Sequence, residues 1–359
     1  MPVQMIGTRR SGSNLLRVMI GKLAGMYAPQ STHMLEYFMP LVPFYGDLND
    51  GNNFYQLADD VCRCVELNPV EWSGVVLDRN EIIKSCKDHS LLSIFAEIYS
   101  SAAKQSDCDT DWMCKCLGYI NYFSEFEEYF NQEVKYLYIH RDGRDVGLSF
   151  GKAMAGQKHL YLVAKEWQQT QELALALKQK LPADRFHQVS YEELLAEPEK
   201  ICRQVAEFIG IPYTEEMLNY HKSRSAKLSA SASKLWGNIT KPIIVNNSKK
   251  FLAETFTDEL KMFELLAGET LEKLGYERHY TQSGESIALN EQQLQEIELI
   301  NQFRKNIVIE NASLEDVLRR ERQKEFVDSV KQRLGAEEVS YHGNMLHKQD
   351  VTSTSEAVA

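Results

Sequence analysis

The 359-residue sequence lacks the features that define several common protein classes. No apolar run approaches the ~20 residues that a helix needs to cross a membrane. The seven cysteines form no Cys-x-x-Cys pair, which argues against a zinc site, and their odd number fits reduced thiols. The chain runs from Met1 straight into an apolar strand, leaving no room for a signal peptide. We therefore expect a cytoplasmic protein with no integral membrane segment.

An excess of positive charge is also missing. Lys and Arg number 40 against 51 Asp and Glu, which gives a net charge of -11. A general nucleic-acid binder must neutralise phosphates with clustered Lys and Arg, so we expect no nucleic-acid partner, although a local cationic pocket is compatible with these numbers. With 43% hydrophobic residues, the chain can bury one large core.

Short apolar runs alternate with amphipathic helical patterns over residues 1–280, which we predict to form one domain. Strands are predicted at 3–6, 112–114, 134–140 and 186–189, and helices at about 88–104, 119–130, 160–180, 192–209 and 257–274. This alternation is typical of an α/β three-layer sandwich with a central parallel sheet, in which ligands bind at the carboxyl ends of the strands.

Residues 285–335 are predicted to form a helical extension with amphipathic segments at about 289–309 and 313–334. The first segment carries an apolar stripe made of Leu294, Ile297, Ile300, Phe303 and Ile307. The stripe needs a partner, either the main domain or a second subunit, so a homodimer through the C-terminal helices is one of two alternatives. Residues 336–359 are rich in Ser, Thr, His and Glu and are predicted to be a disordered tail.

A loop of small residues, Gly7-Thr-Arg-Arg-Ser-Gly-Ser-Asn14, follows the first predicted strand. Backbone amides in such a turn, ahead of a helix N-terminus, make a concave anion site, and Arg10 adds a cation. The spacing imitates the P-loop of nucleoside triphosphatases, but Ser13 and Asn14 stand where that loop needs Lys and then Ser or Thr. The loop therefore lacks both the lysine that would bind a γ-phosphate and the hydroxyl that would coordinate magnesium. A nucleotide with a 5′ mono-ester end remains compatible with the loop.

The strand predicted at 134–140 ends in a second candidate anion site. Arg141 at the strand end supplies a bidentate phosphate fork, and Ser149, eight positions later, can add a hydroxyl from the following helix. Taken alone, the stretch Arg141-Asp-Gly-Arg-Asp145 is also compatible with a salt-bridged surface turn.

Together these motifs resemble the PAPS-dependent sulfotransferases, in particular the bacterial type, over roughly residues 3–277. The resemblance implies the P-loop-like sulfotransferase fold and 3′-phosphoadenosine 5′-phosphosulfate (PAPS) as the co-substrate. It also implies roles for particular residues. The residues that would hold the 5′-phosphosulfate are Arg10, Ser11, Gly12, Ser13 and Asn14. Arg141 and Ser149 would bind the 3′-phosphate, and Tyr191 would lie against the adenine. Lys249 and Lys250 would belong to a late basic loop that closes over the 3′-phosphate.

Sulfuryl transfer needs cations at the bridging oxygen and usually a base, but no metal. Arg10 matches the loop cation, and Lys115, which ends the strand predicted at 112–114, matches a family lysine. Eukaryotic cytosolic members place a catalytic His two residues later, whereas this chain has Leu117 there. Other members take a carboxylate from the segment after the first helix. There we favour His33 as the base, because an imidazole titrates near the working pH, with Glu36 as the alternative.

The sequence thus predicts a sulfotransferase that acts on a hydroxyl or amine of a small molecule, lipid or peptide. The alternatives are a P-loop kinase or NTPase-like phosphotransferase and a non-catalytic nucleotide-binding protein. The acceptor pocket is expected from residues 26–110 and 215–245. Side chains there that suggest an apolar acceptor portion are Phe38, Leu41, Phe44, Tyr45 and Trp236.

Overall fold

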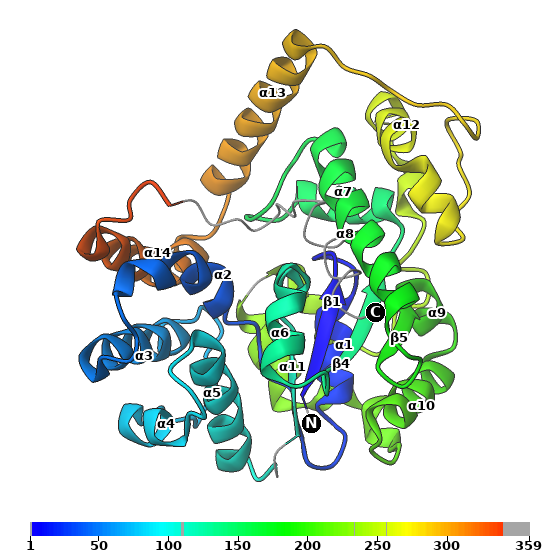
Figure 1. Ribbon diagram of the computed structural model, residues 1–359. Helices are drawn as coiled ribbons and strands as arrows, with labels where there is room; N and C mark the ends of the chain where they lie inside the picture. The colour runs from blue at the N-terminus through cyan, green and yellow to red at the C-terminus, as the bar shows by residue number, and fades with distance from the viewer. Residues whose placement is uncertain (1, 109–110, 233, 256, 340–359) are drawn as a thin grey trace, which may run out of the picture.

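A five-stranded parallel sheet forms the centre of the protein in the computed structural model, which describes residues 2–108, 111–232, 234–255 and 257–339 (Figure 1). The strand order is β2-β3-β1-β4-β5, and all four neighbouring pairs are parallel. The strands are β1 (Val3–Gly7), β2 (Met26–Tyr27), β3 (Asp111–Cys114), β4 (Lys135–His140) and β5 (Phe186–Ser190). The predicted α/β class and central parallel sheet are confirmed.

Helices cover both faces of this sheet, because its strands are apolar on both sides. On one face, Met5 and Leu137 pack with α1 (Ser13–Ile20), α9 (Tyr191–Ala196), α10 (Pro198–Ile209) and α11 (Arg224–Ala232). On the other face, Ile6 and Tyr138 share a core with α2 (Met34–Phe38), α3 (Gly51–Glu66), α4 (Arg79–Ser85), α5 (Leu91–Gln105), α6 (Phe123–Tyr129) and part of α8 (Leu160–Lys180). A third core joins α8 to α7 (Gly143–Gly151) and α12 (Thr257–Lys273).

The helix predicted at 119–130 is instead a 3-10 turn, Leu117–Tyr122, followed by α6. Within the stretch predicted at 192–209, Pro198 opens a helix as expected, α10, and Glu197 leaves the helical conformation between α9 and α10. Strand β2 was not predicted, since a two-residue strand carries no readable alternation. The remaining short 3-10 turns are Met39–Tyr45, Glu215–Met217, Tyr220–Lys222, Lys234–Thr240 and Lys250–Ala253.

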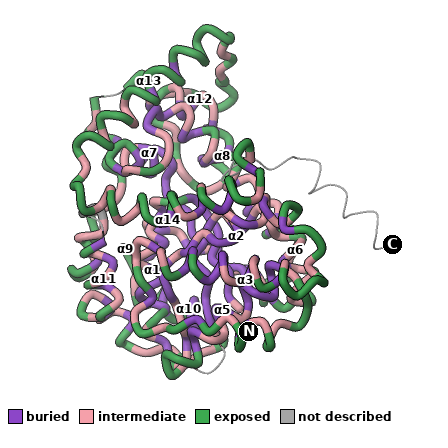
Figure 2. The backbone as a smooth tube through the Cα atoms, turned by 90° about the vertical axis from the view of Figure 1, so that its left-hand side faces the viewer, coloured by how far each residue is buried: buried purple, intermediate pink, exposed green. Residues whose placement is uncertain are grey.

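The C-terminal extension consists of α13 (Glu291–Glu310) and α14 (Leu314–Leu334). The predicted boundary near 280–285 falls between α12 and α13, in a stretch without helix or strand. Of the predicted apolar stripe, only Ile297 is buried, whereas Phe303 is 66% exposed, and much of α13 is exposed in Figure 2. The homodimer stays a prediction. Residues 340–359 of the predicted tail lie outside the described residues.

None of the described helices combines the length and apolar character that crossing a membrane requires.

Candidate active site

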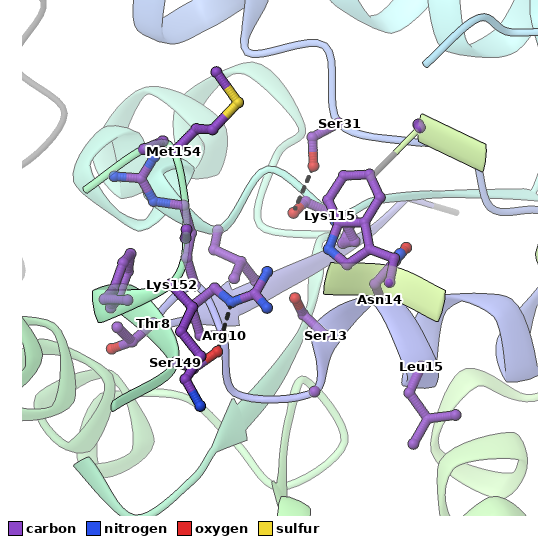
Figure 3. A pocket seen from close by; sticks show the side chains of 18 of the residues that line it. Thr8, Arg10, Ser13, Asn14, Leu15, Ser31, Lys115, Ser149, Lys152 and Met154 are labelled. Carbon is purple, nitrogen blue, oxygen red and sulfur yellow. Dashed lines mark hydrogen bonds between the residues drawn. The ribbon is translucent and has the colours of Figure 1, made fainter. Parts of the chain in front are cut away.

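The carboxyl ends of the five strands open into one cavity of about 1450 Å³ (Figure 3). Each strand supplies part of its lining: Thr8 follows β1, Gln30 follows β2, Lys115 follows β3, Arg141 follows β4 and Tyr191 follows β5. Because parallel strands end at the same edge of a sheet, residues far apart in the sequence meet here. A single small ligand fills about 300–1000 Å³, so this cavity has room for a nucleotide and a second molecule.

Two glycines give the opening loop its shape. Gly7 has a φ of 137°, and a Cβ there would lie 2.2 Å from the carbonyl oxygen of Ile139 on β4. Gly12 caps α1 with a φ of 86°, and a Cβ there would lie 2.2 Å from the Tyr191 ring. Arg10 also has a positive φ, of 75°. Only glycine fits at the first two positions, so the loop makes a tight turn that brings the start of α1 to the cavity.

The two predicted anion elements meet directly. Nε of Arg10 donates a hydrogen bond of 2.9 Å to Oγ of Ser149, which lies on α7 (Figure 3). Nη1 of Arg141 donates to the backbone carbonyl of Arg10 at 3.3 Å. Ser149 therefore contacts the loop cation as well as belonging to the predicted 3′-phosphate element.

The two guanidiniums create a local surplus of positive charge. Burial and the neighbouring Arg141 lower the pKa of Arg10 to about 10. Arg141 is paired with Asp145 at 3.0 Å, but among the described residues no carboxylate forms an ion pair with Arg10. Three buried polar atoms here have no hydrogen-bond partner among the described residues: Oγ of Ser11, Nδ2 of Asn14 and Nε of Arg141. Buried donors without partners are expensive, so the arrangement is suited to an anion.

A network that the sequence did not reveal orients Asn14. Its Oδ1 accepts hydrogen bonds from Nε of Arg17 at 2.9 Å and from Nε2 of Gln30 at 3.1 Å. Arg17 and Gln30 in turn donate to Oγ of Ser229 on α11. The amide nitrogen of Asn14 is thereby left free to donate. Arg17 follows two leucines on a short amphipathic helix, so nothing in the sequence marked it as buried.

Tyr191 closes the site from the side of β5. The guanidinium carbon of Arg141 lies 4.7 Å from the centre of the Tyr191 ring, and Asn247 donates a 2.6 Å hydrogen bond to the tyrosine hydroxyl. The carbonyl of Asn247 also accepts from Arg141 at 3.1 Å, a role that the sequence did not indicate. Of the two predicted lysines of the late loop, Lys250 lines the cavity and Lys249 does not.

The stretch from Arg141 to Asp145 is not a surface turn, because Arg141 is 7% and Arg144 is 1% exposed. The two arginines have different surroundings. Arg144 is compensated by Asp142 at 2.7 Å and by Glu264 on α12 at 2.5 Å, so it holds α7 against α12. Arg141 faces the cavity and keeps an unpartnered Nε.

His33 and Glu36, the two candidate bases, are joined by a hydrogen bond. Nδ1 of His33 lies 2.9 Å from Oε2 of Glu36, and both residues line the cavity. His33 precedes α2 with a φ of 57°, which turns the chain so that its ring can meet Glu36. Burial alone lowers the pKa of His33, but the Glu36 carboxylate outweighs it and raises the pKa above the ordinary value. Burial raises the pKa of Glu36, but His33 holds it below the ordinary value.

Lys115 adds a further basic group to the cavity. It is 9% exposed, and burial together with Arg17 lowers its pKa to about 7. Its Nζ lies 5.9 Å from the centre of the Trp236 ring. His140, by contrast, is not part of the cavity lining: both ring nitrogens have partners in Tyr276 and Gln188, and burial lowers its pKa to about 4.

Both segments expected to form the acceptor pocket, 26–110 and 215–245, contribute to the cavity lining. Of the five expected side chains, Trp236 lines the cavity, whereas Phe38, Leu41 and Tyr45 are buried in the core and Phe44 is 43% exposed away from the cavity. Apolar side chains that line pockets and those that fill cores have the same sequence pattern. The lining also includes α8, the end of α13 and the first half of α14, which the sequence did not indicate.

A sulfotransferase family model and solved sulfotransferase domains match this chain. The model of a sulfotransferase family matches residues 2–215. Among solved structures, the fold is similar to the sulfotransferase domain from the Synechococcus PCC 7002 olefin synthase, with 21% identity, a TM-score of 0.53, and coverage of 78% of this chain and 96% of that one. A sulfotransferase domain from the curacin biosynthetic pathway is similar at 17% identity and a TM-score of 0.50, with 78% and 99% covered. No curated protein sequence matches significantly.

Proposed function

The chain belongs to the sulfotransferase family, and from that premise we propose that it transfers the sulfuryl group of PAPS to a hydroxyl or amine of an acceptor. One observation carries the proposal: Arg10 of the first anion element and Ser149 of the second, 139 residues apart, are joined by a 2.9 Å hydrogen bond in one cavity. A nucleotide phosphorylated at both its 5′ and 3′ ends needs two anion sites within one cleft, and Arg residues are well suited to bind each phosphate.

The described residues fit such a donor. Ser11 and Asn14 offer unpartnered buried donors beside Arg10, where the 5′-phosphosulfate would bind. Arg141 offers its unpartnered Nε to the 3′-phosphate, and Lys250 lines the same cavity. Tyr191 presents an aromatic ring, already in contact with Arg141, against which an adenine can pack.

In the proposed reaction, the acceptor oxygen bonds to sulfur while the bond between sulfur and the bridging oxygen breaks. The electron pair of that bond leaves with 3′-phosphoadenosine 5′-phosphate (PAP). Arg10 and Lys115 stabilise the charge that develops on the leaving phosphate. His33, oriented by the bond from its Nδ1 to Glu36, takes the acceptor proton on Nε2. Glu36 then stabilises the imidazolium.

The opening loop does not favour a kinase or NTPase. Ser13 and Asn14 occupy the positions of the P-loop lysine and hydroxyl residue, and Oδ1 of Asn14 is already engaged by Arg17 and Gln30. Neither residue can supply a cation to a γ-phosphate.

Isothermal titration with PAP tests donor binding. We expect micromolar affinity, and at least a tenfold loss in Arg141→Ala, because one hydrogen bond to a charged group contributes about 1.5–3 kcal/mol. Lys249→Ala, outside the cavity, is the matched control. Transfer of radiolabelled sulfate from PAPS into metabolites of a cell lysate then tests catalysis. A wild-type protein without PAP affinity would refute the proposal.

A further inference from the structure

The C-terminal helices lie against the same cavity as the donor and base residues. The lining from this extension runs from the end of α13 into α14 and comprises Ile307, Val308, Asn311, Ala312, Ser313, Glu315, Asp316, Arg319, Arg320, Gln323 and Lys324. We propose that the extension is the outer wall of the acceptor site and selects a hydroxylated acceptor with an apolar body and a polar outer end. This inference rests on the proposed function.

The upstream end of the wall is anchored on the α7–α8 side. Asn301 is 1% exposed, and its Oδ1 accepts hydrogen bonds from the backbone amides of Lys158 at 2.7 Å and His159 at 3.2 Å. One turn later, Arg304 makes a two-pronged ion pair with Glu259 on α12, at 3.0 and 2.6 Å. A buried amide that satisfies two backbone donors fixes the position of a helix, because any shift would leave those donors unpaired.

The downstream end is anchored on the opposite side, at α3. Gln323 is buried and donates a 2.8 Å hydrogen bond to the carbonyl of Cys64. Further along α14, Val327 and Val330 belong to the core that covers the sheet, and Arg333 pairs with Asp60. The extension is therefore held at α12 on one side and at α3 on the other.

The segment between these anchors, residues 305–322, contains most of the lining from the extension. This segment is also attached to α11, where Arg319 donates to the backbone carbonyl of Ser231 at 3.3 Å. One continuous piece of chain is thus attached to α12, α3 and α11, and α11 itself contributes Ser231 and Ala232 to the cavity lining. Figure 1 shows the same course, with α13 passing from the side of α12 toward α14 near α2 and α3.

The lining differs between the main domain and the extension. In the main domain it includes buried or half-buried apolar side chains, namely Val70, Ile120, Leu148, Met154 and Leu173. On α14 it includes charged side chains in two i,i+4 pairs, Glu315–Arg319 at 2.6 Å and Asp316–Arg320 at 3.1 Å. Each pair neutralises itself, so this part of the wall favours a polar group without net charge. An acceptor with an apolar body between its reactive hydroxyl and a polar end matches a cavity lined in this way.

Linear primary alcohols of four to twelve carbons are suitable probes for this wall. We expect kcat/KM to rise with chain length in the wild-type protein, by up to about fourfold for each methylene that reaches apolar lining, and 1,12-dodecanediol to be better than 1-dodecanol. Ala312→Trp fills the cavity from the extension. It should lower kcat/KM for 1-dodecanol at least tenfold relative to 1-butanol and leave PAP affinity unchanged.

Two further variants make the result specific. Glu310→Trp places the same indole two residues earlier, on an exposed residue outside the lining, and should behave like the wild type. If Ala312→Trp does not fold, as judged by its thermal transition, Ile307→Trp replaces it, because Ile307 is 40% exposed and tolerates a larger side chain.

Equilibrium dialysis with tritiated 1-dodecanol, with and without PAP, separates this inference from the proposed function. Loss of dodecanol binding in Ala312→Trp supports the wall even in a protein that fails to bind PAP, in which case only the proposed function fails. The inference is overturned if dodecanol does not bind the wild type, if Ala312→Trp affects short and long alcohols equally, or if only folded proteins serve as acceptors.

Discussion

Nδ1 of His33 lies 2.9 Å from Oε2 of Glu36, three residues later in the chain, and both side chains are only partly exposed. The pairing settles the tautomer of a neutral His33: the proton is on Nδ1, so Nε2 carries the lone pair. An imidazole held in this way can take a proton from an acceptor, while its carboxylate partner stabilises the resulting cation.

Replacing Glu36 with Gln should therefore change the pH dependence as well as the rate. The neutral amide removes the charge that raises the His33 pKa, so the ascending limb of the kcat profile should move to lower pH. We expect kcat to fall roughly 10- to 100-fold, less than the loss of about 10² to 10⁴ for His33→Ala. PAP affinity should stay unchanged in both variants. If the ascending limb does not shift in Glu36→Gln, the Glu36 charge does not control the group whose titration limits kcat.

A second pH effect follows from Lys115, whose pKa is lowered to about 7 by burial and Arg17. The cation is present below this pKa and is lost as pH rises through it, so kcat/KM for PAPS should decline above about pH 7. Bound PAPS is an anion and raises the Lys115 pKa, so the descending limb of kcat should lie at higher pH than that of kcat/KM. Lys115→Arg keeps its charge throughout and should abolish the descending limb. If the descending limb persists in Lys115→Arg, it is caused by the titration of another group.

The sequence could predict those site residues whose positions follow from local secondary structure. Arg10, Arg141 and Tyr191 each follow a predicted strand, and because parallel strands end at one edge, their meeting could be expected. The pairing of His33 with Glu36 was within reach too, since the two residues are one helical turn apart.

Other features depend on contacts between distant segments and left no local signal. Arg17 has the sequence context of a surface arginine, yet it is buried by Ser225 and Ser229, more than 200 residues later. Phe38 is an aromatic residue near the base, but the direction of its side chain is decided by α2 packing on the core. The position of α13 and α14 against the cavity depends on buried amides such as Asn301, which in sequence resembles any polar helix residue.

Gly118 gives a test of the base pair in which neither member is itself replaced. A Cβ at this position would lie 2.6 Å from Oε1 of Glu36, so Gly118→Ala must displace the carboxylate. We expect kcat to fall about as far as in Glu36→Gln and PAP affinity to stay within twofold. Gly51→Ala, where a Cβ meets nothing within 4 Å, is the control for the glycine replacement itself. Unchanged kcat in Gly118→Ala would mean that Glu36 has room to move without loss of function.

The two neighbouring lysines of the late loop provide a matched pair. Lys250 lines the cavity and Lys249 does not, although both are exposed and carry the same charge. Lys250→Ala should weaken PAP binding about three- to tenfold at low salt, and the difference from wild type should shrink as salt screens the interaction. Lys249→Ala should bind PAP like the wild type. Titration calorimetry at two ionic strengths measures both, and equal losses would show that only the overall charge of the loop matters.

Gly12 tests the contact between the opening loop and Tyr191. Gly12 has a φ of 86° and an added Cβ would lie 2.2 Å from the tyrosine ring, whereas Gly25 has a φ of 75° with nothing within 4 Å. Gly25→Ala should lose about 1–2 kcal/mol of stability from the left-handed backbone alone. Gly12→Ala should lose clearly more and bind PAP at least tenfold more weakly, because the loop or the ring must move.

Tyr191→Ala in the Gly12→Ala background separates the collision from the backbone strain. Removing the ring abolishes the clash, so the free-energy losses of the two single variants, measured by denaturant unfolding, should sum to more than the loss in the double variant. The double variant should regain stability relative to Gly12→Ala but not PAP affinity, since the aromatic contact is gone. Strictly additive losses would show that the loop relaxes away from Tyr191, and the close approach of the ring would then not be what requires glycine at this position.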